Sequence, residues 1–380
     1  MPVSIAILGT RGIPANYGGF ETFAEELSHR LVQRGHAVTV YCRSHHTPPE
    51  LDSFRGARLT VLPTIRHKYL DTVAHGLVSS LHALGSRHEV ILVCNAVNAS
   101  FIPILKLSGA RVAINVDGLE WQRKKWNRLG KGLYRLSEKI ACLAADAIVT
   151  DSMTIQSYYD RVHRRPTSFI PYGAPTEKVS RNGTLTRLGL SPGKYVLYVS
   201  RFEPENNAHL VLDAFRRVST DVKLVMVGDA PYARPYISRL KEMAGPRVLF
   251  PGYVFGEAYR ELMSYAYCYV HATEVGGTHP ALIEGMGLSN GVLVADTPEN
   301  REVAGDSALF FSLAGPDDLA ERLGLALGNP KLLHTLSEKA RQRVRLRYTW
   351  DRVTDSYEEL LLSLRERASW RTAPDEPPLS

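Results

Sequence analysis

The sequence predicts an α/β protein built from two doubly wound domains. Short apolar runs of strand length alternate with helix-length amphipathic segments through both halves of the chain, as in parallel sheets covered by helices. The length of 380 residues also exceeds one ordinary core, because a domain averages about 150 residues. Residues 171–175 and the polar, turn-rich segment after them separate the two halves. We therefore expect domains at 1–172 and 173–349, a helix at 350–367 and a disordered tail at 368–380.

The first half opens with a strand, a glycine-rich loop and a helix. Residues 5–8 are apolar and run into Gly9-Thr10-Arg11-Gly12. Gly18 and Gly19 then precede one apolar helical face, made of Phe20, Phe23, Ala24, Leu27 and Leu31. Further strands are expected at 38–41, 59–62, 90–93, 112–116 and 145–152. The first turn lacks GxGxxG, so the dinucleotide fingerprint is absent.

The second half repeats the alternation of strands and helices. Strands are expected at 195–199, 223–227, 248–250, 268–271 and 291–295. Helices are expected at 208–218, 317–327, 332–347 and 350–364.

Residues 269–287 are the most informative stretch of the chain. An apolar strand ends, a loop with Gly276 and Gly277 follows, and Pro280 stands where the first turn of a helix tolerates a missing N–H. The start of such a helix attracts an anion, because its free N–H groups and its dipole point at the ligand. Glu284, about one turn inside, can accept hydrogen bonds from a vicinal diol such as that of ribose. The alternative is a buried helix start with a solvated glutamate.

Two features follow the strand expected at 112–116. Asp117 stands at its carboxyl end, where ligands bind in open α/β sheets, although an aspartate there can also cap the next helix. The segment 121–135 mixes six basic residues with two tryptophans. It is either a surface that touches anionic lipid headgroups with its aromatic rings at the interface, or a solvated basic helix whose rings pack inward.

The composition is that of a globular protein, with 44% apolar and 22% charged residues and a formal net charge of +7. This basic excess suits an anionic ligand or membrane surface, and no nucleic-acid partner is expected. The four cysteines are scattered without metal-ligand spacing, so we expect reduced thiols and no metal site. Neither a signal peptide nor a spanning segment is visible, and we expect a cytoplasmic protein, at or near the inner face of the plasma membrane if the lipid interpretation holds.

The second half resembles the carboxyl-terminal domain of the family-four glycosyltransferases. The resemblance covers roughly residues 195–357 and rests on segments spaced as in that family: 199–202, 227–229, 251–254, 269–287 and 300–303. The first half is similar to a bacterial subgroup that includes rhamnosyltransferases of polysaccharide assembly. That similarity rests on residues 9–14, 17–21 and 117–121.

The resemblance implies the GT-B fold, in which two Rossmann-like domains face a central cleft, and a carboxyl-terminal helix that crosses back onto the first domain. It implies a nucleotide-diphospho-sugar held mainly by the second domain, with Arg201 on the diphosphate and Glu284 on the ribose. The full set of donor-site residues is then Gly18, Gly19, Arg201, Asn206, Gly276, Gly277, Thr278 and Glu284. The acceptor, a saccharide or lipid-linked saccharide, would enter past Arg11, Asn16, Tyr17 and Glu120.

The chain departs from the family pattern at two positions. Where the family's first glutamate usually stands, eight residues before Glu284, this chain has Gly276, and the nearest upstream acid is Glu274. The lysine that commonly follows the family arginine is also absent after Arg201. The same substitutions in the rhamnosyltransferase-like subgroup indicate a changed donor, and dTDP-rhamnose is the expected one.

The implied reaction is sugar transfer with retention at the anomeric carbon. Arg201 and the backbone N–H groups of Gly276, Gly277 and Thr278 would stabilise the leaving diphosphate, and Asp117 would orient the acceptor or the sugar. No cofactor or divalent ion is expected, since GT-B enzymes generally neutralise the diphosphate with protein groups. Two alternatives remain open: a nucleotide-sugar 2-epimerase, and a non-catalytic member of the fold that binds a nucleotide sugar.

Overall fold

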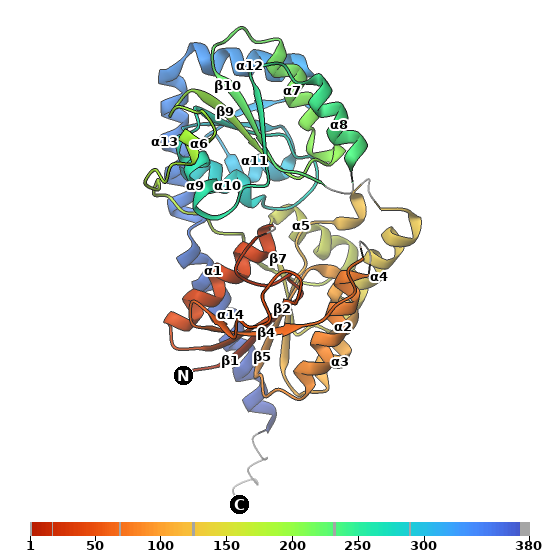
Figure 1. Cartoon of the computed structure of the whole chain (residues 1–380). Coiled ribbons are helices and arrows are strands. Elements are labelled where there is room, and N and C mark those ends of the chain that lie inside the picture. Colours follow the sequence, from red (N-terminus) through yellow and green to blue (C-terminus); the bar gives the residue numbers. More distant parts are fainter. Residues whose placement is uncertain are drawn as a thin grey trace, which may run out of the picture.

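The structure is a computed structural model that describes residues 2–16, 18–67, 70–123, 126–230, 233–288 and 290–372, with side chains described up to residue 366. Two α/β domains are stacked on each other, the amino-terminal one below and the carboxyl-terminal one above in Figure 1. Each is organised around its own mostly parallel sheet. The expectation of two doubly wound domains is confirmed.

In the described part of the chain, the amino-terminal sheet has eight strands in the order β3-β4-β2-β1-β5-β6-β7-β8. All neighbours are parallel except β3 and β4. The strands are β1 (Ser4–Leu8), β2 (Ala37–Arg43), β3 (Ser53–Phe54), β4 (Ala57–Leu62), β5 (Val90–Cys94), β6 (Arg111–Asn115), β7 (Ala147–Thr150) and β8 (Ser168–Phe169).

The carboxyl-terminal sheet has six parallel strands among the described residues, in the order β11-β10-β9-β12-β13-β14. They are β9 (Tyr195–Val199), β10 (Lys223–Val227), β11 (Val248–Gly252), β12 (Cys268–His271), β13 (Val292–Ala295) and β14 (Leu309–Phe311). This is the 3-2-1-4-5-6 order of nucleotide-binding sheets, and the order reverses between β9 and β12. Ligands bind in open α/β sheets at the carboxyl ends of the strands that flank such a reversal.

Helices cover both sheets. In the first domain they are α1 (Gly19–Gln33), α2 (Asp71–Leu84), α3 (Ile102–Lys106), α4 (Arg128–Ala144) and α5 (Met153–Tyr158), with short helical turns η1 (Ala96–Phe101), η2 (Glu120–Gln122) and η3 (Tyr159–His163). In the second they are α6 (Thr184–Arg187), η4 (Pro204–Asn206), α7 (Ala208–Arg216), α8 (Arg234–Met243), α9 (Gly256–Tyr265), α10 (Pro280–Leu288), α11 (Pro298–Ala304), α12 (Pro316–Gly328) and α13 (Pro330–Arg347).

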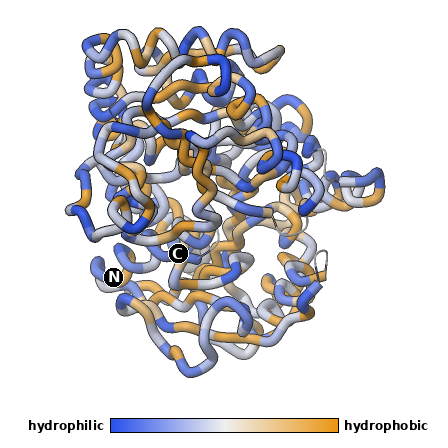
Figure 2. The backbone as a smooth tube through the Cα atoms, turned by 45° about the horizontal axis from the view of Figure 1, so that its top comes forward, coloured by the Kyte–Doolittle hydropathy of each residue, from blue (hydrophilic) through white to orange (hydrophobic). Residues whose placement is uncertain are grey.

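The central strands are buried on both faces, which explains their nearly continuous apolar sequences. Every residue of β5 and of β13 is buried, for example. Figure 2 shows the resulting alternation of apolar and polar stretches along the chain in both domains. All four cysteines are free thiols, as expected, and three of them are buried.

The last helix, α14 (Trp350–Thr372), follows the second domain in sequence and packs on the first. Its Tyr357 is buried and accepts a hydrogen bond from Asn115 Nδ2 at 2.7 Å. Its Glu358 pairs at 2.5 Å with Arg34, the residue that caps the end of α1. The helix continues to Thr372, so the expectation of disorder is wrong for residues 368–372; the first helix breaker after Trp350 is Pro374. The rest of the expected tail, 373–380, lies outside the described residues.

Among the described residues, every helix is too short or too polar to cross a lipid bilayer.

Candidate functional site

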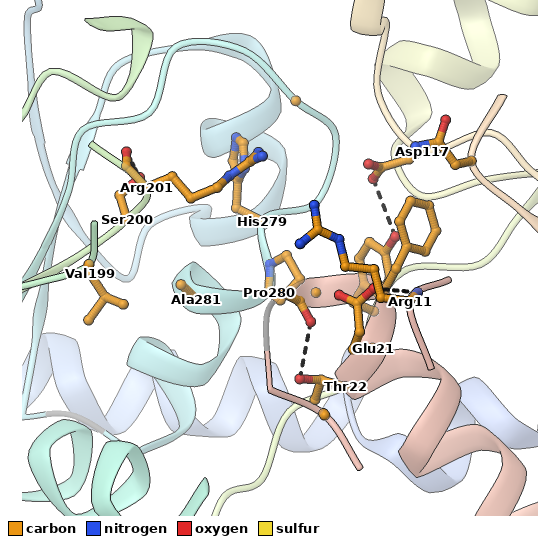
Figure 3. A pocket seen from close by; sticks show the side chains of 18 of the residues that line it. Arg11, Glu21, Thr22, Asp117, Val199, Ser200, Arg201, His279, Pro280 and Ala281 are labelled. Atoms are coloured by element: carbon orange, nitrogen blue, oxygen red, sulfur yellow. Dashed lines mark hydrogen bonds between the residues drawn. The ribbon is translucent and has the colours of Figure 1, made fainter. Parts of the chain in front are cut away.

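A cavity of about 1020 Å³ lies between the two domains and is lined by both. From below it is bordered by the loop after β1 and the start of α1, and from above by the loops after β9 and β12. Figure 3 shows Arg11 and Arg201 extending from these opposite walls, with His279 at the Arg201 side and Asp117 at the Arg11 side. The cavity therefore occupies the place that the strand order of the second sheet favours for a ligand.

Arg201 lies just after β9 and lines the cavity, with 32% of its side chain exposed. Asn206 fixes the loop that carries it: Asn206 Nδ2 donates to the Arg201 carbonyl at 2.7 Å, and Tyr198 donates to the Asn206 carbonyl at 2.6 Å. Because this loop is fixed, the guanidinium group of Arg201 is positioned to bind a phosphate group, whose oxygens match its planar arrangement of N–H donors.

Gly276 and Gly277 line the cavity where the two domains touch. A Cβ on Gly277 would lie 1.9 Å from Asp151 Oδ1, and one on Gly276, whose φ is +159°, would lie 2.3 Å from the His279 ring. Side chains are thus excluded here by protein packing. The glycine pair allows the second domain to approach the ends of strands β6 and β7 of the first.

Thr278 takes part in the same contact between the domains. Its N–H donates to Asp151 Oδ2 at 2.9 Å, and its hydroxyl donates to the Asp151 carbonyl. The Thr278 N–H, expected to meet the diphosphate, is thus bonded to a buried carboxyl group in this structure, and its contact with a donor stays a prediction. The sequence expectation missed Asp151, which follows β7 and is separated from Thr278 by 127 positions.

Glu284 lies inside α10, lines the cavity and accepts a 2.6 Å hydrogen bond from the Tyr259 hydroxyl. Burial raises the pKa of Glu284 to about 7, although the Tyr259 hydrogen bond acts in the opposite direction. A carboxyl group in this state ionises near neutral pH and can then accept hydrogen bonds from a diol.

Asp117 lines the cavity from the first domain, with a left-handed φ of 56°. Its carboxylate accepts from the buried Tyr172 hydroxyl at 3.3 Å, and its N–H donates to Asn115 Oδ1 at 2.9 Å. The helix-capping alternative is wrong, because Asn127 caps α4 and Leu119 precedes η2. Asp117 is held toward the cavity.

Asp117 also interacts electrostatically with the buried carboxyl group of Asp151. Burial, followed by the charge of Glu120, raises the pKa of Asp117. Burial and then the charge of Asp117 raise the pKa of Asp151 well above its usual range. Both shifts favour the protonated carboxyl group at the junction of the two domains.

The remaining expected residues lie in different places. Arg11 and Glu120, expected on the acceptor side, line the cavity, and so do Gly18 and Gly19, expected at the donor site. Asn16 is exposed, and its side chain donates to the His46 carbonyl at 3.2 Å, so the structure does not bring it into the cavity. The expected contact at Tyr17 lies outside the described residues.

Both tryptophans of the basic segment pack inward. Trp126 lines the cavity and donates from Nε1 to Glu120 at 3.3 Å, and Trp121 packs against Tyr158 with the Arg135 guanidinium 4.4 Å from its ring centroid. The expectation of aromatic rings at a lipid surface is therefore wrong. Trp126 packs in the cavity wall, and Trp121 packs against the core of the first domain.

Arg123 of this segment also lines the cavity and is only 8% exposed. The sequence predicted a basic surface here, and nothing in its local pattern distinguishes a buried arginine from its solvated neighbours. His271 and His279, within the stretch singled out from the sequence, likewise line the cavity. Burial, and then the charge of Arg123, lowers the pKa of His279 to about 3, so its ring is neutral.

Among the described residues, no group of three or more histidine, cysteine, aspartate or glutamate side chains could hold a metal ion. The expectation that catalysis needs no divalent ion stays a prediction.

Comparison with known protein families assigns each half of the chain. Residues 188–343 match the family described as "Glycosyl transferases group 1", and residues 3–175 match a "Domain of unknown function (DUF1972)". The fold is GT-B, and the second domain is similar to the glycosyl transferases group 1.

Bacterial relatives and solved structures agree with this assignment. The O-antigen chain mannosyltransferase C of Escherichia coli is 22% identical over 94% of this chain and 97% of its own. The lipopolysaccharide 1,2-N-acetylglucosaminetransferase of Salmonella typhimurium is 25% identical over 56% of this chain, and the match spans 61% of the Salmonella protein. This chain thus matches less than two thirds of that relative's length.

The sucrose-phosphate synthase of Thermosynechococcus elongatus has the same fold, with a TM-score of 0.81, 19% identity and coverage of 96% of this chain and 99% of the synthase. Anabaena HepE in complex with UDP-glucose superimposes with a TM-score of 0.76 at 16% identity, over 95% of this chain and all of HepE (100%). At these identities the structures establish the fold alone.

Proposed function

We propose that the protein is a retaining glycosyltransferase that moves a sugar from a nucleotide-diphospho-sugar to a saccharide or lipid-linked saccharide in cell-surface polysaccharide synthesis. One observation carries the proposal: Arg201, Glu284 and the start of α10 line one cavity at the strand reversal of the second sheet. Arg201 supplies charge for a diphosphate and Glu284 an acceptor for ribose hydroxyls. The named relatives of surface-polysaccharide synthesis support the same class of reaction.

In the proposed reaction the bond between the anomeric carbon and the leaving phosphate oxygen breaks, and a bond to the acceptor oxygen forms on the same face. The acceptor's proton passes to the leaving diphosphate. Negative charge grows on that diphosphate, so Arg201 stabilises the transition state more than the ground state. Asp117, on the opposite wall, orients the acceptor or the sugar.

We propose dTDP-rhamnose as the donor, on the strength of the sequence departures at Gly276 and after Arg201. The named relatives transfer other sugars, mannose and N-acetylhexosamines, so the donor must be measured. None of the relatives named here is an epimerase, and the 2-epimerase alternative finds no support.

Differential scanning fluorimetry against a panel of nucleotide sugars tests the donor, because a ligand that binds only the folded state raises its apparent stability. The largest shift is expected with dTDP-rhamnose, and it should decrease in Arg201→Ala. A larger shift with UDP- or GDP-sugars would reject rhamnose and keep the reaction class. No shift with any nucleotide or nucleotide sugar would contradict the proposed donor site. Chelation with EDTA is expected to leave turnover unchanged.

We also propose that the protein contacts anionic lipid peripherally through α4, which overlaps the segment 121–139 and extends past it to Ala144. Four leucines stand along one face of α4, with exposures of 86% for Leu129, 45% for Leu133, 54% for Leu136 and 87% for Leu143. Basic residues stand beside this face, at Arg128, Lys131, Arg135 and Lys139. An apolar stripe flanked by positive charge suits the interface of an anionic bilayer.

Vesicle sedimentation tests the lipid contact. The wild type is expected to sediment with phosphatidylglycerol vesicles and less with phosphatidylcholine vesicles, and Leu129→Glu with Leu136→Glu should abolish the difference. Leu346→Glu, at a leucine of α13 that is 58% exposed, is the matched control and should bind like the wild type. Equal sedimentation of all three proteins with both lipids would reject the contact.

A further inference from the structure

Glu203 places a buried carboxylate between arginines of the two domains. Its side chain is 3% exposed, and its Oε2 lies 3.9 Å from Arg201 Nη2 and 3.8 Å from Arg123 Nη1. Arg201 belongs to the second domain, and Arg123 reaches Glu203 from the segment after η2 of the first. All three residues line the cavity.

These distances show an ion pair that is looser than a direct hydrogen bond. Charge-assisted hydrogen bonds between nitrogen and oxygen measure about 2.7–2.9 Å, and both contacts of Glu203 Oε2 to these arginines are longer. Arg123 is held more tightly from its other side, where its Nε lies 2.5 Å from Glu120 Oε1. Glu120 therefore fixes Arg123 within its own domain, and Glu203 is the more distant partner of Arg123 across the domains.

The charges explain why this arrangement matters for an anionic ligand. Two arginines and two carboxylates, Glu120 and Glu203, balance each other locally. A diphosphate added beside them would introduce further negative charge near the Glu203 carboxylate, which is itself only 3% exposed, so the two anions would repel each other. The same diphosphate, with more oxygens than one carboxylate, can accept from both guanidinium groups.

We propose that Arg123 is a second ligand of the donor diphosphate, and that Glu203 occupies the diphosphate's position between Arg123 and Arg201 until the donor displaces it. The inference rests on the proposed function and deepens it. The second domain lacks the lysine that commonly follows the family arginine, here Arg201. Arg123 of the first domain would supply the missing positive charge at the diphosphate subsite. When the donor binds, its diphosphate replaces Glu203 as the anion that links Arg123 of the first domain to Arg201 of the second.

Isothermal titration with inorganic pyrophosphate, with UDP and dTDP, and with the nucleosides uridine and thymidine tests this assignment. Arg123→Gln should weaken pyrophosphate and nucleoside diphosphate binding about tenfold or more, and leave nucleoside binding unchanged. Arg123→Lys should restore part of the loss. Glu203→Gln should strengthen pyrophosphate binding, because it removes the internal competitor and keeps the shape of the side chain.

Glu302→Gln is the control for a broken domain contact. Glu302 lies outside the cavity and accepts hydrogen bonds across the domains from the Met153 N–H, at 2.8 Å, and from the Thr154 N–H, at 3.3 Å. This variant should bind pyrophosphate like the wild type.

Three results would overturn the inference. Unchanged pyrophosphate binding in Arg123→Gln, when the wild type binds it, removes Arg123 from the subsite and leaves the proposed function intact. An equal loss for nucleosides and diphosphates means that Arg123 supports the architecture only. Weaker pyrophosphate binding in Glu203→Gln rejects the role of Glu203. If the wild type binds neither pyrophosphate nor any nucleoside diphosphate, the proposed function fails as well.

Discussion

The two walls of the cavity are built in different ways. The upper wall draws on two loops at one strand reversal, after β9 and after β12, so its key residues belong to short continuous segments. The lower wall gathers Arg11, Asp117, Arg123 and Tyr172 from segments that are distant in sequence. The upper wall is therefore recognisable from sequence, whereas the lower wall exists only once the chain has folded.

The walls also differ in their chemistry. The lower wall concentrates acids, and burial raises the pKa of Asp117 and of Asp151 where the domains meet. The upper wall presents Arg201 and the start of α10, both suited to anions. We infer that the upper wall, together with Arg123, binds the donor and that the rest of the lower wall controls the geometry of transfer. Four variants test that division.

Arg201→Ala should lower kcat/KM by about 100-fold or more, because it removes a charged donor from the leaving group. Steady-state kinetics with the donor found by fluorimetry measure this loss. Arg345→Ala, at an exposed arginine of the same domain that pairs with Glu177 at 3.3 Å, is the matched control. Equal activity of the two variants would contradict a donor role for the upper wall.

Asp117→Asn should lower kcat by about 100-fold and change the KM for the donor little, because it removes the charge that orients the reacting groups and keeps the shape. Steady-state kinetics that determine kcat and the donor KM separately measure this effect. A rise in KM with unchanged kcat would move Asp117 to the donor-binding role assigned to the upper wall.

Glu284→Gln should abolish a pH dependence of nucleotide affinity. The ribose hydroxyls donate to the ionised carboxylate, and Glu284 has a pKa of about 7, so wild-type affinity should fall about tenfold from pH 8 to pH 6. Titration calorimetry at both pH values measures this change. An affinity that rises as the pH falls, or the same dependence in the glutamine variant, would contradict the ribose contact.

Asp151→Asn should stabilise the protein by about 2 °C at pH 8 and change it less at pH 5. Because the pKa of Asp151 is higher in the folded protein than in the unfolded chain, protonation of Asp151 stabilises the folded state. This stabilisation is complete below the ordinary carboxyl pKa and is lost as the pH rises from there through the pKa of the folded state. An asparagine keeps the shape of the side chain and can accept from the Thr278 N–H without a bound proton. Thermal melts across this range check the prediction, and an increasing destabilisation of the variant with pH would contradict the raised pKa of Asp151.

Much of the fold could be predicted from periodicity. The expected strands at 195–199, 223–227 and 268–271 match β9, β10 and β12 residue for residue, and α10 begins at Pro280 as expected. These segments are buried on both faces and bounded by turn residues, so local composition identifies them. Helix α4 was less predictable, because its exposed leucines give it an apolar face that points away from the core.

The site was only partly predictable. Arg201, Glu284 and Asp117 all line the cavity, because each follows or begins an element that the sequence identifies. The contact of Asp151 with Thr278 joins positions 127 apart and has no local signature. Asn16 could not be placed correctly for a similar reason. A glycine-rich loop is recognisable from sequence, but the sequence does not determine which of its side chains face the cleft, and Asn16 is exposed.

The central claim is tested most directly by NMR of the reaction products. The purified protein is incubated with each nucleotide sugar, with and without lipid-linked saccharide, and nucleoside diphosphate release and the anomeric configuration of the product are followed. We predict release that depends on acceptor, a product with the donor's anomeric configuration, and loss of both in Arg201→Ala. An inverted product would contradict retention, and absence of turnover with every donor and acceptor that binds would contradict the assignment as a transferase.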